Sequence, residues 1–213
     1  MVQANHSCDF CTEAQSDSVR PEFVSIIGGE SRTLLKFPGL YVIPTLSPIV
    51  ANHVLIIPKT HVTSRLQLDP ASREQLTAAE NYVRKVLASP ANTVMTFEHG
   101  IGIGMTGGCG VSHLHVHMMP LECHVAERAQ SLLQQSKLGE GSAGLLYLSS
   151  RDSYVYMRCD TAGILSTLVR TGDFPSQFLR NLIEDASGMP RTNWRDMVRS
   201  ELLRETLMAP HWT

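Results

Sequence analysis

Short apolar segments separated by glycine and proline dominate the first 120 residues of the chain. They lie at 22–27 (EFVSII), 33–37 (TLLKF), 40–44 (LYVIP), 53–58 (HVLIIP), 93–98 (TVMTFE) and 112–119 (SHLHVHMM). Apolar runs of about four to eight residues, bounded by turn formers, are typical of strands. We therefore predict a mostly β region up to residue 120.

One helix is predicted within this region, over residues 70–88. Asp69 followed by Pro70 supplies an N-cap and a first-turn proline, which together favour a helix start. Apolar residues then recur at helical spacing, at Leu76, Ala79, Val83, Val86 and Leu87. That period places them on one face of a helix.

The pattern changes after residue 120. It predicts a helix over 122–138, a glycine-rich break at 139–144, and a hairpin that pairs 145–150 (LLYLSS) with 153–158 (SYVYMR). Two amphipathic helices are then expected, on the apolar stripes Phe178, Leu179, Leu182, Ile183 and Ala186, and Val198, Leu202, Leu203 and Leu207.

The chain length of 213 residues suits one substantial core with an appended region. We expect an α+β domain over residues 1–120 and a mostly helical extension over 121–213, which packs on the core or completes it. Hydrophobic residues make up 43% and charged residues 18% of the chain, a globular composition that argues against disorder.

Charge and hydropathy argue against two classes of partner. Eighteen basic and twenty acidic residues give a net charge of −2, without the basic excess that binding to long nucleic acid requires. No stretch approaches the ~20 apolar residues of a membrane span, and the first residues lack the apolar core of a signal peptide. We expect a cytoplasmic protein whose five cysteines are reduced.

The sequence GGCGVSHLHVHMMP at 107–120 places histidines at alternate positions, His113, His115 and His117. On a strand, alternate side chains share a face, so the three imidazoles would point one way and the apolar residues between them into the core. The outer two would lie ~13 Å apart at about 3.3 Å per residue, too far for one ion to bind all three easily. We expect the rings to have different roles.

The chemistry of this segment favours attack on phosphorus. A neutral imidazole is a usable nucleophile or proton carrier near neutral pH when a second group fixes its tautomer. Gly107, Gly108 and Gly110 allow close backbone approach and present N–H groups to an anionic oxygen. Two alternatives stay open: a surface strand with incidental histidines, and a metal hydrolase that uses an H-x-H pair to hold a catalytic ion.

Two segments resemble signatures of the histidine triad superfamily. SHLHVHMM resembles the His-φ-His-φ-His-φ-φ signature, where φ is hydrophobic, and NHVLIIPKTHV at 52–62 resembles the strand motif upstream of it. The resemblance covers residues 8–120. It implies an α+β fold with a five-stranded antiparallel sheet, a homodimer, and hydrolysis or transfer at the α-phosphate of a nucleotide derivative.

The same resemblance implies roles for single residues. The middle triad histidine, His115, would attack phosphorus to give a nucleotidyl-histidine intermediate, which water or another acceptor resolves. His117 would contact the phosphate and help protonate the leaving group, and His53 would support the triad. A non-catalytic nucleotide-binding protein on the same scaffold is the alternative outside catalysis.

The amino-terminal CDFC resembles the Cys-x-x-Cys of the zinc-bearing bacterial branch of that family. The ligand set that this resemblance implies is Cys8, Cys11, His61 and His113. Two thiolates and two imidazoles form a closed tetrahedral set, so the zinc would be structural. The alternative is a reduced cysteine pair on a mobile terminus, and Mg²⁺ is expected only with a polyphosphate substrate.

The glycine-rich loop departs from the family pattern. Cys109 and Gly110 stand where many members have glutamine and serine or threonine, so backbone contacts would replace side-chain contacts. We expect the substrate phosphate to lie against Gly108, Cys109, Gly110 and Ser112, together with His117.

Other residues of interest carry two interpretations each. Glu98 and His99 are expected to bind substrate, with pairing of Glu98 to an arginine as the alternative. Thr45 stands near the position where relatives hold the ribose with an acidic residue, which argues against a plain adenosine substrate. Trp194 and Trp212 are expected in helices that bury an apolar stripe; alternatively, they shape the leaving-group side of the pocket or cover a dimer partner.

Overall fold

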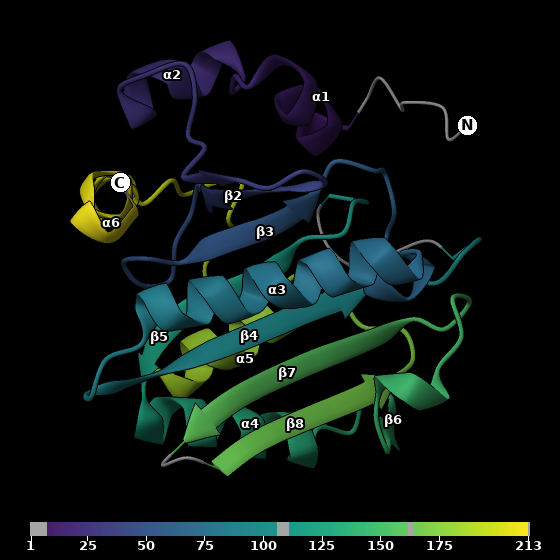
Figure 1. Cartoon of the computed structure of the whole chain (residues 1–213). Coiled ribbons are helices and arrows are strands. Elements are labelled where there is room, and N and C mark those ends of the chain that lie inside the picture. Colours follow the sequence, from purple (N-terminus) through teal and green to yellow (C-terminus); the bar gives the residue numbers. More distant parts are fainter. Residues whose placement is uncertain (1–7, 106–110, 162–163, 213) are drawn as a thin grey trace.

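Eight antiparallel strands form one sheet in the part of the chain that the structure describes. The computed structural model describes residues 8–105, 111–161 and 164–212 (Figure 1). The strands are β1 Leu35–Lys36, β2 Leu40–Pro44, β3 Val54–Pro58, β4 Asn92–Gly100, β5 Val116–Glu122, β6 Glu140–Ser142, β7 Tyr154–Thr161 and β8 Ile164–Thr171. Their order is β1-β2-β3-β5-β4-β7-β8-β6.

The α+β class is confirmed, and the sheet is larger than the five strands expected. Strands β1 to β5 account for those five, and β7, β8 and β6 continue the sheet beyond β4. Strands on both sides of residue 120 therefore pair in one sheet, while the boundary at that residue stays a prediction.

Helices cover both faces of the sheet (Figure 1). They are α1 Asp9–Ser16, α2 Pro21–Ile27, α3 Pro70–Leu87, α4 Cys123–Gln135, α5 Phe178–Ala186 and α6 Ser200–Met208. One apolar cluster joins α3 to β3 and β5, and a second joins α4 and α5 to β4, β5 and β7. Neighbouring residues Met118 and Met119 of β5 belong to different clusters, as strand alternation requires. Of the helices described, none has the length and hydropathy of a membrane span.

Helix α3 follows the sequence prediction closely. The carboxylate of Asp69 accepts a hydrogen bond from the backbone N–H of Ser72 at 3.0 Å, so it caps the helix as expected. Leu76, Ala79 and Val83 are buried on the predicted face. The strands at 40–44, 53–58 and 93–98 and the helices at 122–138, 178–186 and 198–207 are also present, with ends shifted by a few residues.

Two predicted strand segments are wrong. Residues 22–27 lie in helix α2, because Pro21 occupies its first turn and Gly28, at φ 76°, ends it. The segment 145–150 contains a short 3₁₀ helix, and β7 pairs with β8 instead. A short apolar run does not by itself distinguish strand from helix, and Leu146 is 96% exposed.

A buried ionic cluster attaches the extension to the loop before β3. Glu184 is fully buried and lies 3.0 Å from Arg180 and 3.4 Å from Arg199. Arg180 donates to the carbonyl of Ser47 at 2.6 Å, and Arg199 donates to that of Ile49 at 3.3 Å. One carboxylate therefore holds two arginines that contact the segment leading to His53.

Replacing Glu184 with alanine is expected to lower the free energy of unfolding by about 3–5 kcal/mol, because the buried Arg180 and the partly buried Arg199 lose their counter-charge. Urea denaturation measures this change. The exposed Glu205→Ala on α6 is the control and should change stability by about 0.5 kcal/mol or less. Equal stability of the two variants would contradict the role given to the cluster.

Candidate active site and metal centre

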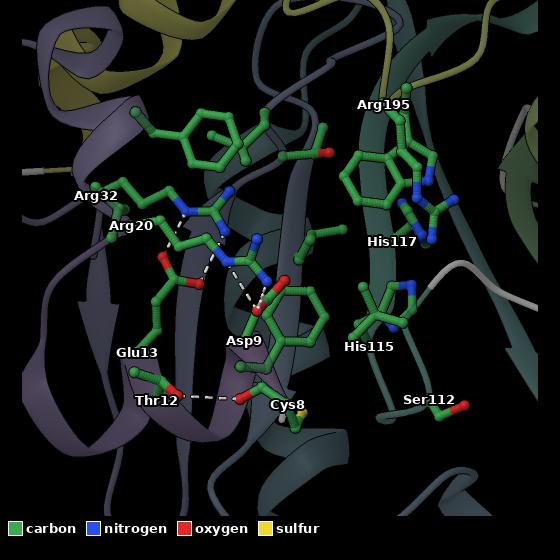
Figure 2. Close-up of a pocket in the computed structure, with 18 of the residues that line it drawn as sticks. Cys8, Asp9, Thr12, Glu13, Arg20, Arg32, Ser112, His115, His117 and Arg195 are labelled. Carbon is green, nitrogen blue, oxygen red and sulfur yellow. Dashed lines mark hydrogen bonds and ion pairs between the residues drawn. The ribbon is translucent and has the colours of Figure 1, made fainter. Parts of the chain in front are cut away.

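A cavity of about 940 Å³ brings the triad segment together with the amino-terminal helices and the extension. In the view of Figure 2, Ser112, His115, His117 and Arg195 follow one another along one side. The opposite side carries α1 and the segment that follows it. His115 and His117 therefore lie on one side of the cavity, and the opposite side comes from elements outside the triad motif.

The three triad histidines do not share one strand, contrary to the prediction. Strand β5 begins at Val116, so only His117 belongs to it. His113 is buried at 2% exposure and does not line the cavity, whereas His115 and His117 line the cavity and are half-buried. The chain bends before the strand because the N–H of Leu114 donates to the carbonyl of Val62 at 2.6 Å.

His115 has a defined tautomer. Its Nδ1 lies 2.6 Å from the carbonyl oxygen of His113, so Nδ1 carries the proton and donates it. The other nitrogen, Nε2, keeps its lone pair. Burial lowers the pKa of His115, which keeps the ring neutral at neutral pH and Nε2 available as a nucleophile.

A chain of hydrogen bonds also defines the tautomer of His117. The backbone N–H of Ile49 donates to Nδ1 of His53 at 3.2 Å, so the proton of His53 lies on Nε2. That nitrogen is 2.9 Å from Nδ1 of His117, which must accept. The proton of His117 therefore lies on its Nε2. The ring of His117 also stacks on Phe97, with centroids 4.3 Å apart and planes within 6°.

The supporting histidines are held neutral. Burial lowers the pKa of His53 well below its usual value, and the positive charges of Arg180 and Arg199 lower it further. Burial also lowers the pKa of His117 well below its usual value, and the nearby His115 and His53 lower it further. The relay from Ile49 to His117 therefore holds one proton on each ring at neutral pH.

Cys8, Cys11, His61 and His113 come together as expected, with ligand atoms within 4.8 Å of one another. The Sγ of Cys8 lies 3.3 Å from Nδ1 of His113, and the Sγ of Cys11 lies 3.3 Å from Nδ1 of His61. Zn–S and Zn–N bonds of ~2.3 Å and ~2.0–2.1 Å put tetrahedral ligand atoms about 3.3–3.8 Å apart, so a metal ion fits with small adjustments. This cluster can hold a metal.

His113 is prepared for this role by its second nitrogen. Its Nε2 lies 2.8 Å from the carbonyl oxygen of Pro58 and donates to it, so Nδ1 faces the thiols with a free lone pair. Metal-binding histidines in proteins commonly donate their other N–H to such a carbonyl, which fixes the ring. His113 thus links the candidate metal ligands to His115, because the carbonyl of His113 accepts the hydrogen bond from Nδ1 of His115.

Helix α1 forms the cavity wall next to the four candidate metal ligands. Glu13 of α1 makes two bonds of 2.8 Å to the nearly buried Arg32, and Arg20 pairs with Asp9 (Figure 2). Phe10 lies 5.4 Å from the ring of His115. Residues 9–16 show little apolar periodicity, so the sequence did not predict this wall.

Glu98 does not line the cavity. Its carboxylate is fully buried, pairs with Arg65 and accepts from the hydroxyl of Tyr154. Glu98 therefore pairs with an arginine, which is the alternative to the expected contact with substrate. Its neighbour His99 does line the cavity, and burial followed by the effect of His115 lowers the pKa of His99 to about 4.

The remaining predicted contacts have mixed outcomes. Ser112 and Thr45 line the cavity. Gly108, Cys109 and Gly110 lie outside the described residues. Trp212 is buried in the core beside α3, as expected, whereas Trp194 lies in a turn and lines the cavity.

Residues 29–124 match the family model of the HIT domain. One relative is the asymmetrical bis(5'-nucleosyl)-tetraphosphatase of Schizosaccharomyces pombe, 30% identical over 115 residues. The match covers 51% of this chain and 59% of that protein. Zinc finger CCCH domain-containing protein 64 of Arabidopsis thaliana is 25% identical over 212 residues, covering 91% of this chain and 33% of that protein.

Solved structures similar to this chain include a zinc-bound histidine triad family protein from Mycobacterium smegmatis. It is 21% identical, with a TM-score of 0.37, and the match covers 54% of this chain and 74% of that one. A hypothetical histidine triad nucleotide-binding protein from Sulfolobus tokodaii is 15% identical, with a TM-score of 0.36 and coverage of 94% and 91%.

The metal centre can be tested by elemental analysis of the purified protein. We expect about one zinc per chain, and at least a tenfold loss of zinc affinity in Cys11→Ser, because a hydroxyl replaces a thiolate ligand. Cys123→Ser, outside the cluster, should retain the metal. Retention of full zinc by Cys11→Ser would exclude the proposed ligand set.

Proposed function

We propose that this chain is a histidine triad protein that cleaves a nucleotide derivative at its α-phosphate through a covalent adduct on His115. The observation that carries the proposal is the bond from Nδ1 of His115 to the carbonyl of His113, which leaves Nε2 unprotonated in a cavity. The likeness to a nucleosyl-tetraphosphatase supports a substrate of this class.

In the first step Nε2 of His115 attacks phosphorus, and the bond from phosphorus to the leaving group breaks. The departing atom takes the electron pair and receives a hydrogen bond from Nε2–H of His117. The adduct leaves a positive charge on the ring of His115, and the carbonyl of His113 stabilises it through Nδ1–H. A covalent intermediate thus replaces one difficult displacement with two easier ones.

In the second step water or another acceptor attacks the same phosphorus. The P–N bond breaks, its electron pair returns to Nε2 of His115, and the proton of the acceptor passes to solvent. Zinc, when bound by the four-residue cluster, supplies a structural link between α1 and the triad segment. A homodimer, a cytoplasmic location and the binding of Mg²⁺ together with a polyphosphate substrate stay predictions.

A metal hydrolase that uses the triad as ligands fits less well. Nδ1 of His115 is occupied by a carbonyl, Nδ1 of His117 accepts from His53, and His113 belongs to the cysteine cluster. A non-catalytic binding protein on this scaffold is distinguished by experiment: it would bind nucleotides without turnover.

Mass spectrometry of protein quenched during turnover tests the nucleophile directly. We expect a mass increase equal to one nucleoside monophosphate residue on the peptide that contains His115, and no adduct or turnover in His115→Ala. His124→Ala changes an exposed histidine outside the cavity and should retain both. Turnover by His115→Ala at the wild-type rate would refute the proposal.

His117→Ala is expected to lower kcat about 10²–10³-fold, because the departing atom loses its hydrogen-bond donor. The loss should be larger for a substrate with a basic leaving group than for one that releases a phosphate, since more charge on the departing atom needs stabilising. Steady-state rates on a nucleoside alkyl phosphate and a dinucleoside polyphosphate measure the difference. The same loss on both substrates would contradict this role.

A further inference from the structure

We propose that the turn at residues 193–196 of the extension forms a subsite for a second nucleotide, the leaving group. In this subsite Trp194 stacks on the base and Arg195 pairs with a phosphate. The inference rests on the proposed function, because it names the part of the substrate that departs from His115.

Trp194 and Arg195 line the same cavity as His115 and His117. The guanidinium of Arg195 lies 4.6 Å above the ring of Trp194. Figure 2 shows Arg195 beyond His117 on the side of the cavity that carries His115. Since His117 presents its N–H to the departing atom, a group that leaves past His117 meets this pair.

Hydrogen bonds within the turn and to Gln177 hold the turn in place. The backbone N–H of Trp194 donates to Oε1 of Gln177 at 3.1 Å, and the side-chain amide of Gln177 lies 3.3 Å from Oδ1 of Asn193. Asn193 also donates to Asp196 at 2.7 Å and accepts from the N–H of Arg195 at 3.2 Å. These bonds hold the turn against the cavity before any ligand arrives.

The attachment of the turn continues into the core. Thr192 precedes the turn, and its N–H and hydroxyl both donate to the buried Glu184, at 3.0 Å and 2.6 Å. The ionic cluster that joins the extension to the loop before β3 therefore also fixes the start of the turn. A wall fixed in this way loses little conformational entropy on binding.

The chemistry of the pair identifies its ligand. An indole ring stacks on any nucleobase, and a guanidinium pairs with phosphate oxygens through two parallel N–H groups. Small-molecule cavities hold ligands within ~300–1,000 Å³, and this one, at about 940 Å³, lies at the upper end. That volume leaves space for a second nucleotide beside the one attacked by His115.

The test compares two substrates with Trp194→Ala and Arg195→Ala. One substrate is a dinucleoside tetraphosphate; the other is a nucleoside 5′-phosphoramidate, which carries a single nucleoside and a small leaving group. We expect KM for the tetraphosphate to rise about 10-fold or more in each variant, with KM for the phosphoramidate within about twofold of wild type.

The matched control is Arg191→Ala. Arg191 belongs to the same tail, is exposed, pairs with Asp185 at 2.6 Å and does not line the cavity. It should leave both KM values unchanged. Thermal melting of all variants identifies any that are misfolded. Equal losses on both substrates would overturn the proposal in favour of a site for the reacting nucleoside, and no loss on either would overturn it entirely.

A binding measurement separates this inference from the proposed function. Titrating His115→Ala protein with ATP, the nucleotide that diadenosine tetraphosphate releases after attack at its α-phosphate, should quench the fluorescence of Trp194, whereas Trp212 is buried in the core and should not respond. The quench should vanish in the His115→Ala, Trp194→Ala double variant. If wild type turns over neither substrate, the proposed function fails, and the titration still decides the subsite: no quench dependent on Trp194 overturns it.

Discussion

The arrangement of protons on His53, His115 and His117 depends on backbone groups that do not react. The N–H of Ile49 donates to Nδ1 of His53 and so places the proton of that ring on Nε2. The carbonyl of His113 accepts from Nδ1 of His115 and so keeps the proton of that ring on Nδ1. Because burial keeps these rings neutral, each has one proton and one lone pair, and the backbone decides which nitrogen has which. An unprotonated nitrogen on His115 and an N–H donor on His117 are thus held on neighbouring rings without a charged partner.

Two buried clusters bring the walls of the cavity to this centre. The cysteine and histidine cluster attaches α1, and the cluster around Glu184 attaches the extension. Both attachments use polar groups that are costly to leave unpaired in the interior, so each specifies one position for its wall. The reactive groups come from a short stretch of sequence, but the enclosure comes from both ends of the chain.

The sequence predicted what local pattern or motif determines and missed what distant contacts decide. Helix α3 was predicted because its cap and apolar stripe lie within 20 residues, and the ligand cluster because its residues resemble a family set. Residues 22–27 were predicted wrongly because the short apolar run resembles a strand, although Pro21 and Gly28 mark the ends of a helix; packing of α2 against α6 and Leu46 adds to its stability. The role of Glu98 stayed undecided between substrate binding and an ion pair, because its partner Arg65 lies 33 positions away in the sequence. Trp194 could not be placed without the turn that holds it.

The stacking of Phe97 on His117 restricts the direction in which the site can act. An imidazole N–H bond lies in the plane of the ring, and a ring clamped parallel to a phenyl group cannot tilt to follow a moving partner. In the proposed mechanism a ligand must therefore bring its departing atom into that plane. Under that mechanism, a molecule that binds with this atom above or below the plane would occupy the cavity as an inhibitor, so selection among similar nucleotides would rest on alignment as much as on affinity.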